Sequence, residues 1–420
     1  MPDLSKQTVL IYDASGSYTH VGEAIAPHVK QVLYYSFWEH AFPRSRDTLP
    51  GMGLDGIERV WDFDDAVPQA DCVVFTDVGR AGLQQRLRDD GIPVWGAGIG
   101  CRLEQDRVAL KNVLKECGLP VAPWQLVRGL DALRAVLKET EDRWIKFSYF
   151  RSDLESFHHL SYFASQVWLD DLGVRLGPYQ TEAEFIVEEP IEGHACEVGI
   201  DGFLVNGELL TPCMWGYEVK DAACIDTTAD MPPRLYECYT KLRPVLQQIR
   251  YCGPFSIEAR ITEDDAYVID FTARFPSPPS EAQALCIENL AEVIVEGANG
   301  NAVAPIYCAP IMAQLVLRSQ WGMEHALGLE IGRPSQVAIH GHCRIEDRDY
   351  AVSCAEIEEF GGAVGSGATV ADAVADAFDA ADSVSGYQVS YDSGAFDKAL
   401  ECIREGESLD VPWGRMAQAA

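Results

Sequence analysis

Two carboxylates near the middle of the chain have the surroundings of functional groups. Glu258 lies in SIEARI and Asp270 in VIDF, so both have apolar neighbours. A buried carboxylate without a partner costs free energy. Two carboxylates that face the same way from adjacent strands suit Mg²⁺ held between the protein and phosphate groups. The alternative is that Asp270 pairs with a nearby arginine, Arg260 or Arg274, and stabilises the sheet.

Two further segments carry charge where a nucleotide could use it. VEEPIEG (187–193) connects two apolar runs, and its backbone could offer donors and acceptors to an adenine edge. Lys146 ends the apolar run Trp144–Phe147, and a lysine buried there needs an anion. Taken singly, the first is equally a solvated acidic loop. The second is equally a surface lysine whose stem lies along apolar neighbours.

The elements that position these residues read as an antiparallel sheet with helices. The segment 256–275 predicts a hairpin that turns at 263–265, and 185–210 predicts two strands with a turn at Asn206-Gly207. Alternation along a strand places Asp270, Thr272 and Arg274 on one face. Helices are expected at 104–117, 130–138 and 233–249, and another follows the capping pair Thr369 and Asp372.

The first hundred residues have a different pattern. Short apolar runs at 9–12, 32–35, 72–75 and 94–96 alternate with helical segments such as 82–90. This order predicts a parallel α/β sheet, with ligand-facing loops after Tyr12 and Phe75. Changes of pattern near residues 98 and 306 predict domains at 1–98, 99–306 and 307–420, the last of α+β type.

Composition limits the partners. The 420 residues include 33 Lys and Arg against 65 Asp and Glu, a formal net charge of −32, which disfavours general binding to nucleic acids or anionic membranes. No apolar window is long enough to span a membrane, and the N-terminus lacks the order of a signal peptide. The 13 scattered cysteines, without a C-x-x-C pair, indicate reduced thiols and a cytoplasmic location.

Taken in order, these segments resemble the ATP-grasp superfamily. EQDRVALKNVLKECGLPVAPW (104–124) resembles its opening helix, WIKF (144–147) its strand lysine and IVEEPIEG (186–193) its linker, and SIEARI with YVIDFTARF resembles its metal hairpin. YVIDFTARFPSPPSEAQ (267–283) and GGAVGSGATVADAVADAFDAADSV (361–384) are most similar to the phosphoribosylamine–glycine ligase family. The resemblance spans about residues 90–400. It implies a pre-ATP-grasp domain, an ATP-grasp domain with lobes 99–183 and 184–306, and a small C-terminal domain.

The resemblance also implies site residues. Those for ATP are Arg107, Lys146, Glu188, Glu189, Pro190, Ile191 and Glu197. Glu197 enters because the family's ribose-binding glutamate falls at Ala195, two residues earlier on the same strand face. Those for Mg²⁺ or Mn²⁺ are Glu258, Asp270 and Thr272, the last standing where the family usually has asparagine. Lys146 and Arg274 would serve the transferred phosphate as catalytic residues.

The activity implied is ATP-dependent joining of a small carboxylate to an amine through an acyl phosphate, as in purine biosynthesis. Two departures leave room for a different acid and amine, or for a weakened protein that binds nucleotide and acts as a structural or regulatory partner. The segment after Lys146 has no glycine, so Arg151, His158 and His159 would cover phosphates by charge, or nothing would cover them. The family's glycine-rich first loop is replaced by Asp13-Ala14-Ser15-Gly16-Ser17. The oligomeric state is not predicted.

Overall fold

The computed structural model describes residues 3–37, 48–149, 156–227, 231–352, 357–411 and 413. The first of its sheets is parallel, as predicted, in the order β3-β2-β1-β4-β5. Its strands are β1 Thr8–Asp13, β2 Gln31–Ser36, β3 Ile57–Arg59, β4 Cys72–Phe75 and β5 Val94–Trp95. The central strands are apolar on both faces because helices cover both sides. These include α1 Thr19–Ile25, α2 Phe63–Ala66 and α3 Ala81–Asp89.

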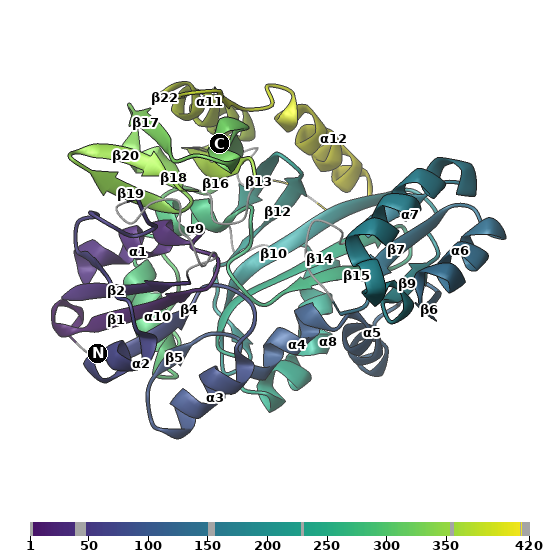
Figure 1. Cartoon of the computed structure of the whole chain (residues 1–420), viewed down its shortest axis with the longest axis horizontal. Coiled ribbons are helices and arrows are strands. Elements are labelled where there is room, and N and C mark those ends of the chain that lie inside the picture. Colours follow the sequence, from purple (N-terminus) through teal and green to yellow (C-terminus); the bar gives the residue numbers. More distant parts are fainter. Residues whose placement is uncertain are drawn as a thin grey trace.

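A large antiparallel sheet forms the centre of the molecule (Figure 1). Its path is β15-β14-β10-β12-β13-β16-β21-β18, with β11 beside β10 and β23 beside β16. The bounds are β10 Ala195–Val205, β11 Glu208–Leu209, β12 Met214–Val219, β13 Ala222–Asp226, β14 Gly253–Thr262, β15 Ala266–Thr272, β16 Ile311–Ser319, β18 Val337–Ile339, β21 Glu359–Gly367 and β23 Val389–Ser390. Because β13 pairs with β16, the sheet continues past residue 306. The domain boundaries at 98 and 306 therefore stay predictions based on sequence pattern.

Helices cover both faces of this sheet. On one face α8 Pro233–Gln248, α11 Val370–Asp382 and α12 Ala395–Ser408 share one apolar core with the strands. On the other, α9 Ser280–Cys286 and α10 Leu290–Ala298 lie between the large sheet and the N-terminal sheet. The predicted cap of α11 is confirmed, since Thr369 Oγ1 accepts a hydrogen bond from the Asp372 N–H at 3.2 Å. A further sheet runs in the order β19-β20-β17-β22, built from β17 Leu327–Ile331, β19 His342–Ile345, β20 Arg348–Ala351 and β22 Val384–Gly386.

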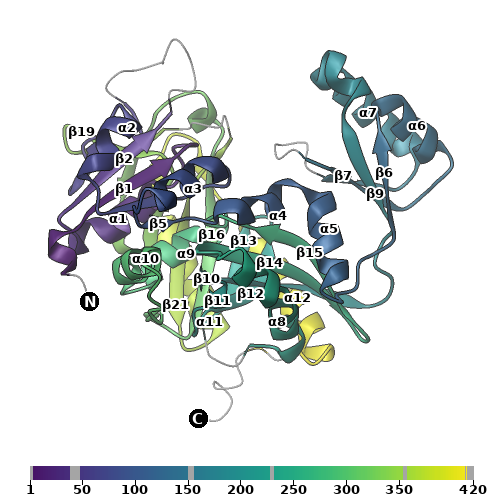
Figure 2. The same ribbon diagram turned by 90° about the horizontal axis from the view of Figure 1, so that it is seen from below.

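A small lobe projects from this body (Figure 2). Its sheet runs β6-β9-β7-β8, built from β6 Trp124–Arg128, β7 Arg143–Phe147, β8 Ser156–His159 and β9 Glu184–Glu188. The helices α6 Leu130–Lys138 and α7 Tyr162–Leu176 pack on it through a separate apolar core. None of the helices in the described ranges combines the length and the apolar composition that crossing a membrane requires.

One expected helix is broken. The segment predicted as a single helix over 104–117 forms α4 Cys101–Gln105 and α5 Arg107–Glu116. Asp106 separates them with an extended backbone (φ −116°, ψ 90°), and its carboxylate accepts a hydrogen bond from the Ala109 N–H at 2.8 Å. An aspartate at this position stabilises a new helix start more than it stabilises a continuous helix. The break places Arg107 on the first turn of α5.

Candidate active site

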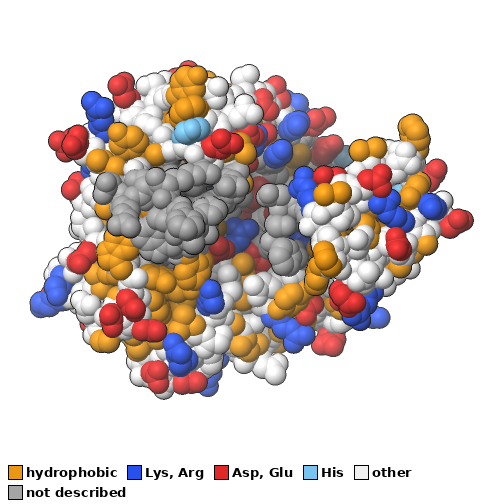
Figure 3. Space-filling view, viewed as in Figure 1, with side chains coloured by type: hydrophobic (Ala, Val, Ile, Leu, Met, Phe, Trp, Pro, Cys, Tyr) orange, Lys and Arg blue, Asp and Glu red, His pale blue; other side chains and the backbone are white. Residues whose placement is uncertain are grey.

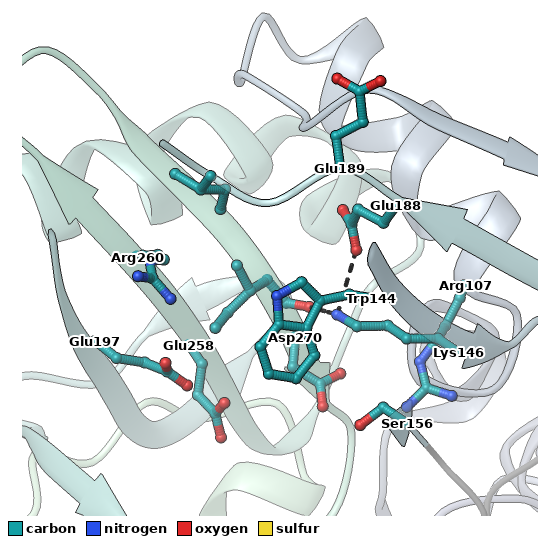
Figure 4. Close-up of a pocket in the computed structure, with 12 residues that line it drawn as sticks. Arg107, Trp144, Lys146, Ser156, Glu188, Glu189, Glu197, Glu258, Arg260 and Asp270 are labelled. Atoms are coloured by element: carbon teal, nitrogen blue, oxygen red, sulfur yellow. Dashed lines mark hydrogen bonds and ion pairs between the residues drawn. The ribbon is translucent and has the colours of Figure 1, made fainter. Parts of the chain in front are cut away.

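A pocket lies between the small lobe and the large sheet, where Figure 3 shows the surface hollowed and lined by charged side chains. Most of the predicted site residues meet there (Figure 4). The lining residues are Arg107, Trp144, Lys146, Ser156, Glu188, Glu189, Ile191, Glu197, Glu258, Arg260, Ile269 and Asp270. Among the predicted residues, Pro190, Thr272 and Arg274 lie outside this lining. The pocket thus joins the strand lysine, the linker and the acidic hairpin in one space.

The hairpin β14–β15 brings its two carboxylates together. Glu258 and Asp270 are direct cross-strand partners, beside an irregularity in the register between Glu258 and Ala259. Burial, and then the neighbouring charges of Asp270 and Glu197, raise the pKa of Glu258 to about 8. Repulsion of this kind is relieved when a cation binds. The pair therefore fits a divalent ion with oxygen ligands.

The protein supplies only part of such a coordination shell. Within the described ranges no group of three or more His, Cys, Asp or Glu side chains is arranged to hold a metal ion. Two protein carboxylates completed by phosphate oxygens and water are the usual arrangement for Mg²⁺. Glu258 and Asp270 fit an ion that arrives with a nucleotide.

A further pair of acids lies on the same sheet. Asp201 of β10 and Glu218 of β12 hydrogen-bond each other, and burial raises the pKa of Asp201 to about 6 and that of Glu218 well above its usual value. Burial and mutual repulsion thus oppose ionisation of both acids, and the charge of Asp201 adds to the effects that raise the pKa of Glu258.

The opposite wall of the pocket is cationic. Lys146 of β7 and Glu188 of β9 point into it from neighbouring strands, with Lys146 Nζ 3.6 Å from Glu188 Oε2 and 3.4 Å from the Ile269 carbonyl (Figure 4). The other oxygen of Glu188 accepts a hydrogen bond from Lys111. Burial lowers the pKa of Lys111, and the Glu188 charge opposes that shift. The linker carboxylate thus holds two lysines.

Arg107 joins this wall from the first turn of α5. It is buried, and its guanidinium donates a hydrogen bond to the Phe147 carbonyl at 3.1 Å. Its backbone N–H donates to the Ser148 carbonyl at 2.9 Å. Arg107 therefore ties α5 to the end of β7, next to Lys146. Lys111 and Lys146 pair with Glu188, and Arg107 adds a third cation to the pocket lining, an arrangement that suits a polyanion.

Glu197 lies in the pocket, whereas the two histidines after Lys146 bond to other groups of the protein. Glu197 lines the pocket and is the cross-strand partner of Arg260, and burial raises its pKa. His159 is buried, with its ring nitrogens bonded to Ser165 Oγ and the Thr140 carbonyl, so its predicted role over phosphates is wrong. His158 stacks on Trp144 at 4.5 Å and bonds Asp142. Arg151 falls outside the described residues.

Arg274 is directed to the N-terminal sheet. Its Nε donates to Glu104 Oε1 at 2.9 Å, and its Nη1 donates to the Tyr18 hydroxyl at 3.0 Å. The buried Glu104 also accepts from the Ala273 N–H. Thr272, two residues before Arg274, is the last residue of β15 and is the cross-strand partner of Ser256. Both residues follow Asp270 along the chain, where β15 leaves the pocket.

The loop after β1 is closed around a protein carboxylate. Asp13 accepts hydrogen bonds from the N–H groups of Gly16 (2.9 Å) and Tyr18 (2.7 Å) and from the Tyr34 hydroxyl (2.6 Å). Backbone N–H groups at such a loop are the donors that bind phosphates in parallel α/β sheets. Here the chain fills that position itself.

Sequence reasoning did not assign Trp144, Ser156, Arg260 and Ile269 to the site, nor Lys111, which pairs with Glu188. Lys111 lies one helical turn after Arg107, a spacing that puts both on one face of α5. Trp144 precedes Lys146 by two residues, so strand alternation points both side chains into the pocket. Ser156, on β8, pairs with Lys146 across the sheet. The two spacings are readable in the sequence, whereas the β7–β8 register is not.

The fold is that of the ATP-grasp enzymes, as the sequence resemblance predicted. The chain is similar to phosphoribosylamine–glycine ligase from Thermotoga maritima, with a TM-score of 0.69, 15% identity, and coverage of 91% of this chain and 98% of that one. It is similar to the biotin carboxylase domain of Hydrogenobacter thermophilus 2-oxoglutarate carboxylase, solved with MgADP, ADP and bicarbonate (TM-score 0.68, 11% identity, coverage 96% and 98%). It is also similar to N5-carboxyaminoimidazole synthetase from Staphylococcus aureus complexed with ADP (TM-score 0.61, 14% identity, coverage 90% and 98%). Neither a family model nor a curated protein matches the sequence.

Proposed function

We propose that the chain is an ATP-dependent carboxylate–amine ligase that works through an acyl phosphate. The observation that carries the proposal is the shared pocket of Lys146, Glu258 and Asp270. A cationic wall faces a pair of repelling carboxylates across a space that a magnesium-bound triphosphate would neutralise on both sides. Two similar structures were solved with ADP bound, which supports nucleotide binding by this fold.

Each group has a part in the proposed reaction. The substrate carboxylate attacks the γ-phosphate of ATP, ADP leaves, and the amine then displaces phosphate from the acyl carbon. Lys146 and Arg107 hold the phosphates and offset the charge that develops during transfer. Glu258 and Asp270 would hold Mg²⁺, which supplies charge neutralisation when bound. No protein nucleophile is needed.

The N-terminal loop favours an acid and amine other than those of phosphoribosylamine–glycine ligase. Asp13 already uses the donors of Gly16, Tyr18 and Tyr34. A phosphate brought to this loop would meet a buried carboxylate instead of free N–H groups, and two anions so close repel each other. We therefore infer a substrate pair without a phosphate at this position.

The test is release of phosphate from ATP with Mg²⁺ and a panel of carboxylate and amine pairs. We expect one pair to stimulate release and to yield an amide detectable by mass spectrometry. Asp270→Asn should abolish the stimulated release, whereas Asp265→Asn, in the exposed turn of the same hairpin, should leave it unchanged. A phosphorylated amine should not be the preferred partner.

The same assays distinguish the ligase from a nucleotide-binding protein with a structural or regulatory role. If the protein binds nucleotide but no carboxylate and amine pair stimulates phosphate release, it is a nucleotide-binding structural or regulatory protein. Absence of nucleotide binding would contradict both. Binding is measured by calorimetry with ADP and Mg²⁺, with Lys146→Met as the variant expected to weaken it.

A further inference from the structure

Two cysteines outside the pocket lining face each other, Cys286 as the last residue of α9 and Cys308 before β16. Ile287 and Tyr307 form an antiparallel bridge, and next to it the Cys308 N–H donates to the Cys286 carbonyl at 2.9 Å. Residues 286 and 308 are therefore directly opposed. Opposed residues joined in this way have Cα atoms about 5.5 Å apart. That separation lies within the range of roughly 4.4–6.8 Å that a disulfide spans.

The two thiols are chemically unequal. Their side chains hydrogen-bond each other, and this bond from Cys286 lowers the pKa of Cys308 to about 7. The same contact raises the pKa of Cys286 well above its usual value. Cys308 is exposed, whereas Cys286 is 5% exposed. Cys308 thus has the features of an attacking thiolate, and Cys286 those of a shielded second thiol.

The other described cysteines lack this combination. Most are buried, and burial raises the pKa of their thiols, as for Cys72 and Cys252. Cys117 and Cys402 are half-buried, and their pKa values are raised as well. Among the cysteines in the described ranges, an exposed thiol with a lowered pKa and a directly opposed partner occurs at Cys308.

We propose that Cys286 and Cys308 are a reversible disulfide site that a low-molecular-weight disulfide oxidises. The Cys308 thiolate attacks one sulfur of the small disulfide and expels a small thiolate, which takes up the proton that Cys308 lost. Cys286 then attacks the Cys308 sulfur of the mixed disulfide, loses its proton and expels a second small thiol. The two protein thiols give up two electrons and two protons, and the small disulfide is reduced to two thiols.

The position of the bond determines its effect. It would tie the end of α9 to the segment before β16 and close a loop that contains α10. A closed loop restricts the unfolded chain, so the oxidised protein should unfold at a higher temperature. Neither cysteine lines the pocket, so nucleotide binding should not change. This inference does not depend on the proposed activity.

The experiment treats the full-length protein with glutathione disulfide and maps the cysteines by peptide mass spectrometry. We expect a linked 286–308 peptide that a reducing agent removes, together with a higher melting temperature. Cys286→Ala should stop at the glutathione adduct on Cys308, because the second thiol is missing. Cys308→Ser should leave Cys286 unmodified. The matched control Cys117→Ser should form the linked peptide as the wild type does.

Alkylation rates provide a second measurement that needs no disulfide. In the wild type, alkylation of Cys308 should rise with pH around a midpoint near 7. In Cys286→Ala the midpoint should move toward that of an ordinary thiol, since the hydrogen bond is lost. The proposal is overturned if wild-type Cys308 keeps the glutathione adduct as Cys286→Ala does. It is equally overturned if neither cysteine reacts while Cys117 does.

Discussion

Lys146 Nζ lies 3.6 Å from Glu188 Oε2, and the same carboxylate accepts a hydrogen bond from Lys111 through its other oxygen. The side chains of Lys111 and Glu188 are 10% and 12% exposed, so water screens this contact little. Two ammonium groups share one carboxylate, and Arg107 adds a third cation to the pocket. The cluster is therefore stable without ligand and still carries net positive charge toward a phosphate.

Glu188→Gln should destabilise the ligand-free protein by about 1–3 kcal/mol, because it removes the countercharge of two partly buried lysines. It should also increase the stabilisation that ADP provides, since the nucleotide then supplies the missing negative charge. Thermal unfolding with and without ADP measures both effects. Glu189→Gln is the control, because that side chain is half-exposed and lies 3.7 Å from Arg143. Equal stability of the two variants would contradict the prediction.

Glu104→Gln should cost roughly 3–5 kcal/mol of stability, the range for breaking a buried ion pair. Glu104 is 2% exposed and holds both Arg274 Nε and the Ala273 N–H, so its loss leaves Arg274 without its strongest partner. Urea unfolding measures the change. The exposed Glu116→Gln, on the next helix, should stay within about 0.5 kcal/mol of the wild type. If Glu104→Gln and Glu116→Gln lose a comparable amount of unfolding free energy, the ion pair of Glu104 with Arg274 does not stabilise the fold as predicted.

Much of the site was readable because its elements follow local rules. Apolar runs with a short acidic turn specify the hairpin that carries Glu258 and Asp270. Its regular register, with Ala259 opposite Val268, would put Ile269 opposite Glu258, and the irregularity between Glu258 and Ala259 brings Asp270 there instead. Lys146 stands out locally as a lysine within an apolar strand, but the residues alone left a surface lysine open, and the family resemblance decided between the two readings. These features depend on residues close together in the chain.

The remaining features depend on contacts between distant segments. Arg274 shares a strand face with Asp270 by alternation, yet the Phe275 N–H donates to the Thr76 carbonyl at 3.1 Å and the chain turns to the N-terminal sheet. The pairing of β13 with β16 joins residues on either side of the boundary expected at 306. Neither contact leaves a pattern in the local sequence, because each is set by which surfaces meet in the fold.

The pair Glu281 and His340 should give stability a defined dependence on pH. Burial alone would raise the pKa of Glu281, but His340 at 2.8 Å lowers it to about 2, against a usual 4.5. Its stabilisation is therefore complete above pH 4.5 and is lost as pH falls toward 2. Burial alone would lower the pKa of His340, but the hydrogen bond and charge of Glu281 outweigh burial and raise it. The stabilisation that comes from protonated His340 is therefore complete below pH 6.5 and is lost at higher pH.

Both contributions are present between about pH 4.5 and 6.5. In that window Glu281→Gln should be less stable than the wild type by roughly 3 kcal/mol, and the difference should shrink as pH falls below 4.5. Denaturant unfolding at pH 5.5 and pH 3 measures it. Glu288→Gln, exposed near the end of the same segment, should show no such dependence. A constant difference for Glu281→Gln at both pH values would contradict the pairing.

Binding of Mg²⁺ to the ADP-loaded protein should tighten as pH rises toward 8. Burial and the charge of Asp270 raise the pKa of Glu258 to about 8, so below that pH the ion must displace a proton from this carboxyl. One displaced proton changes the apparent dissociation constant by about tenfold per pH unit. The effect should level off above pH 8, where Glu258 is already ionised.

Titrations of Mg²⁺ between pH 6 and 9 test this dependence. Glu258→Gln should bind the ion more weakly and lose the protein's share of the slope, while the slope that comes from the nucleotide's own protonation stays in both proteins. Glu263→Gln, in the exposed turn of the hairpin, should behave as the wild type. If the wild type and Glu258→Gln show the same slope, Glu258 does not lose a proton to the ion. The carboxylate pair would then have to be explained as a structural feature of β14 and β15.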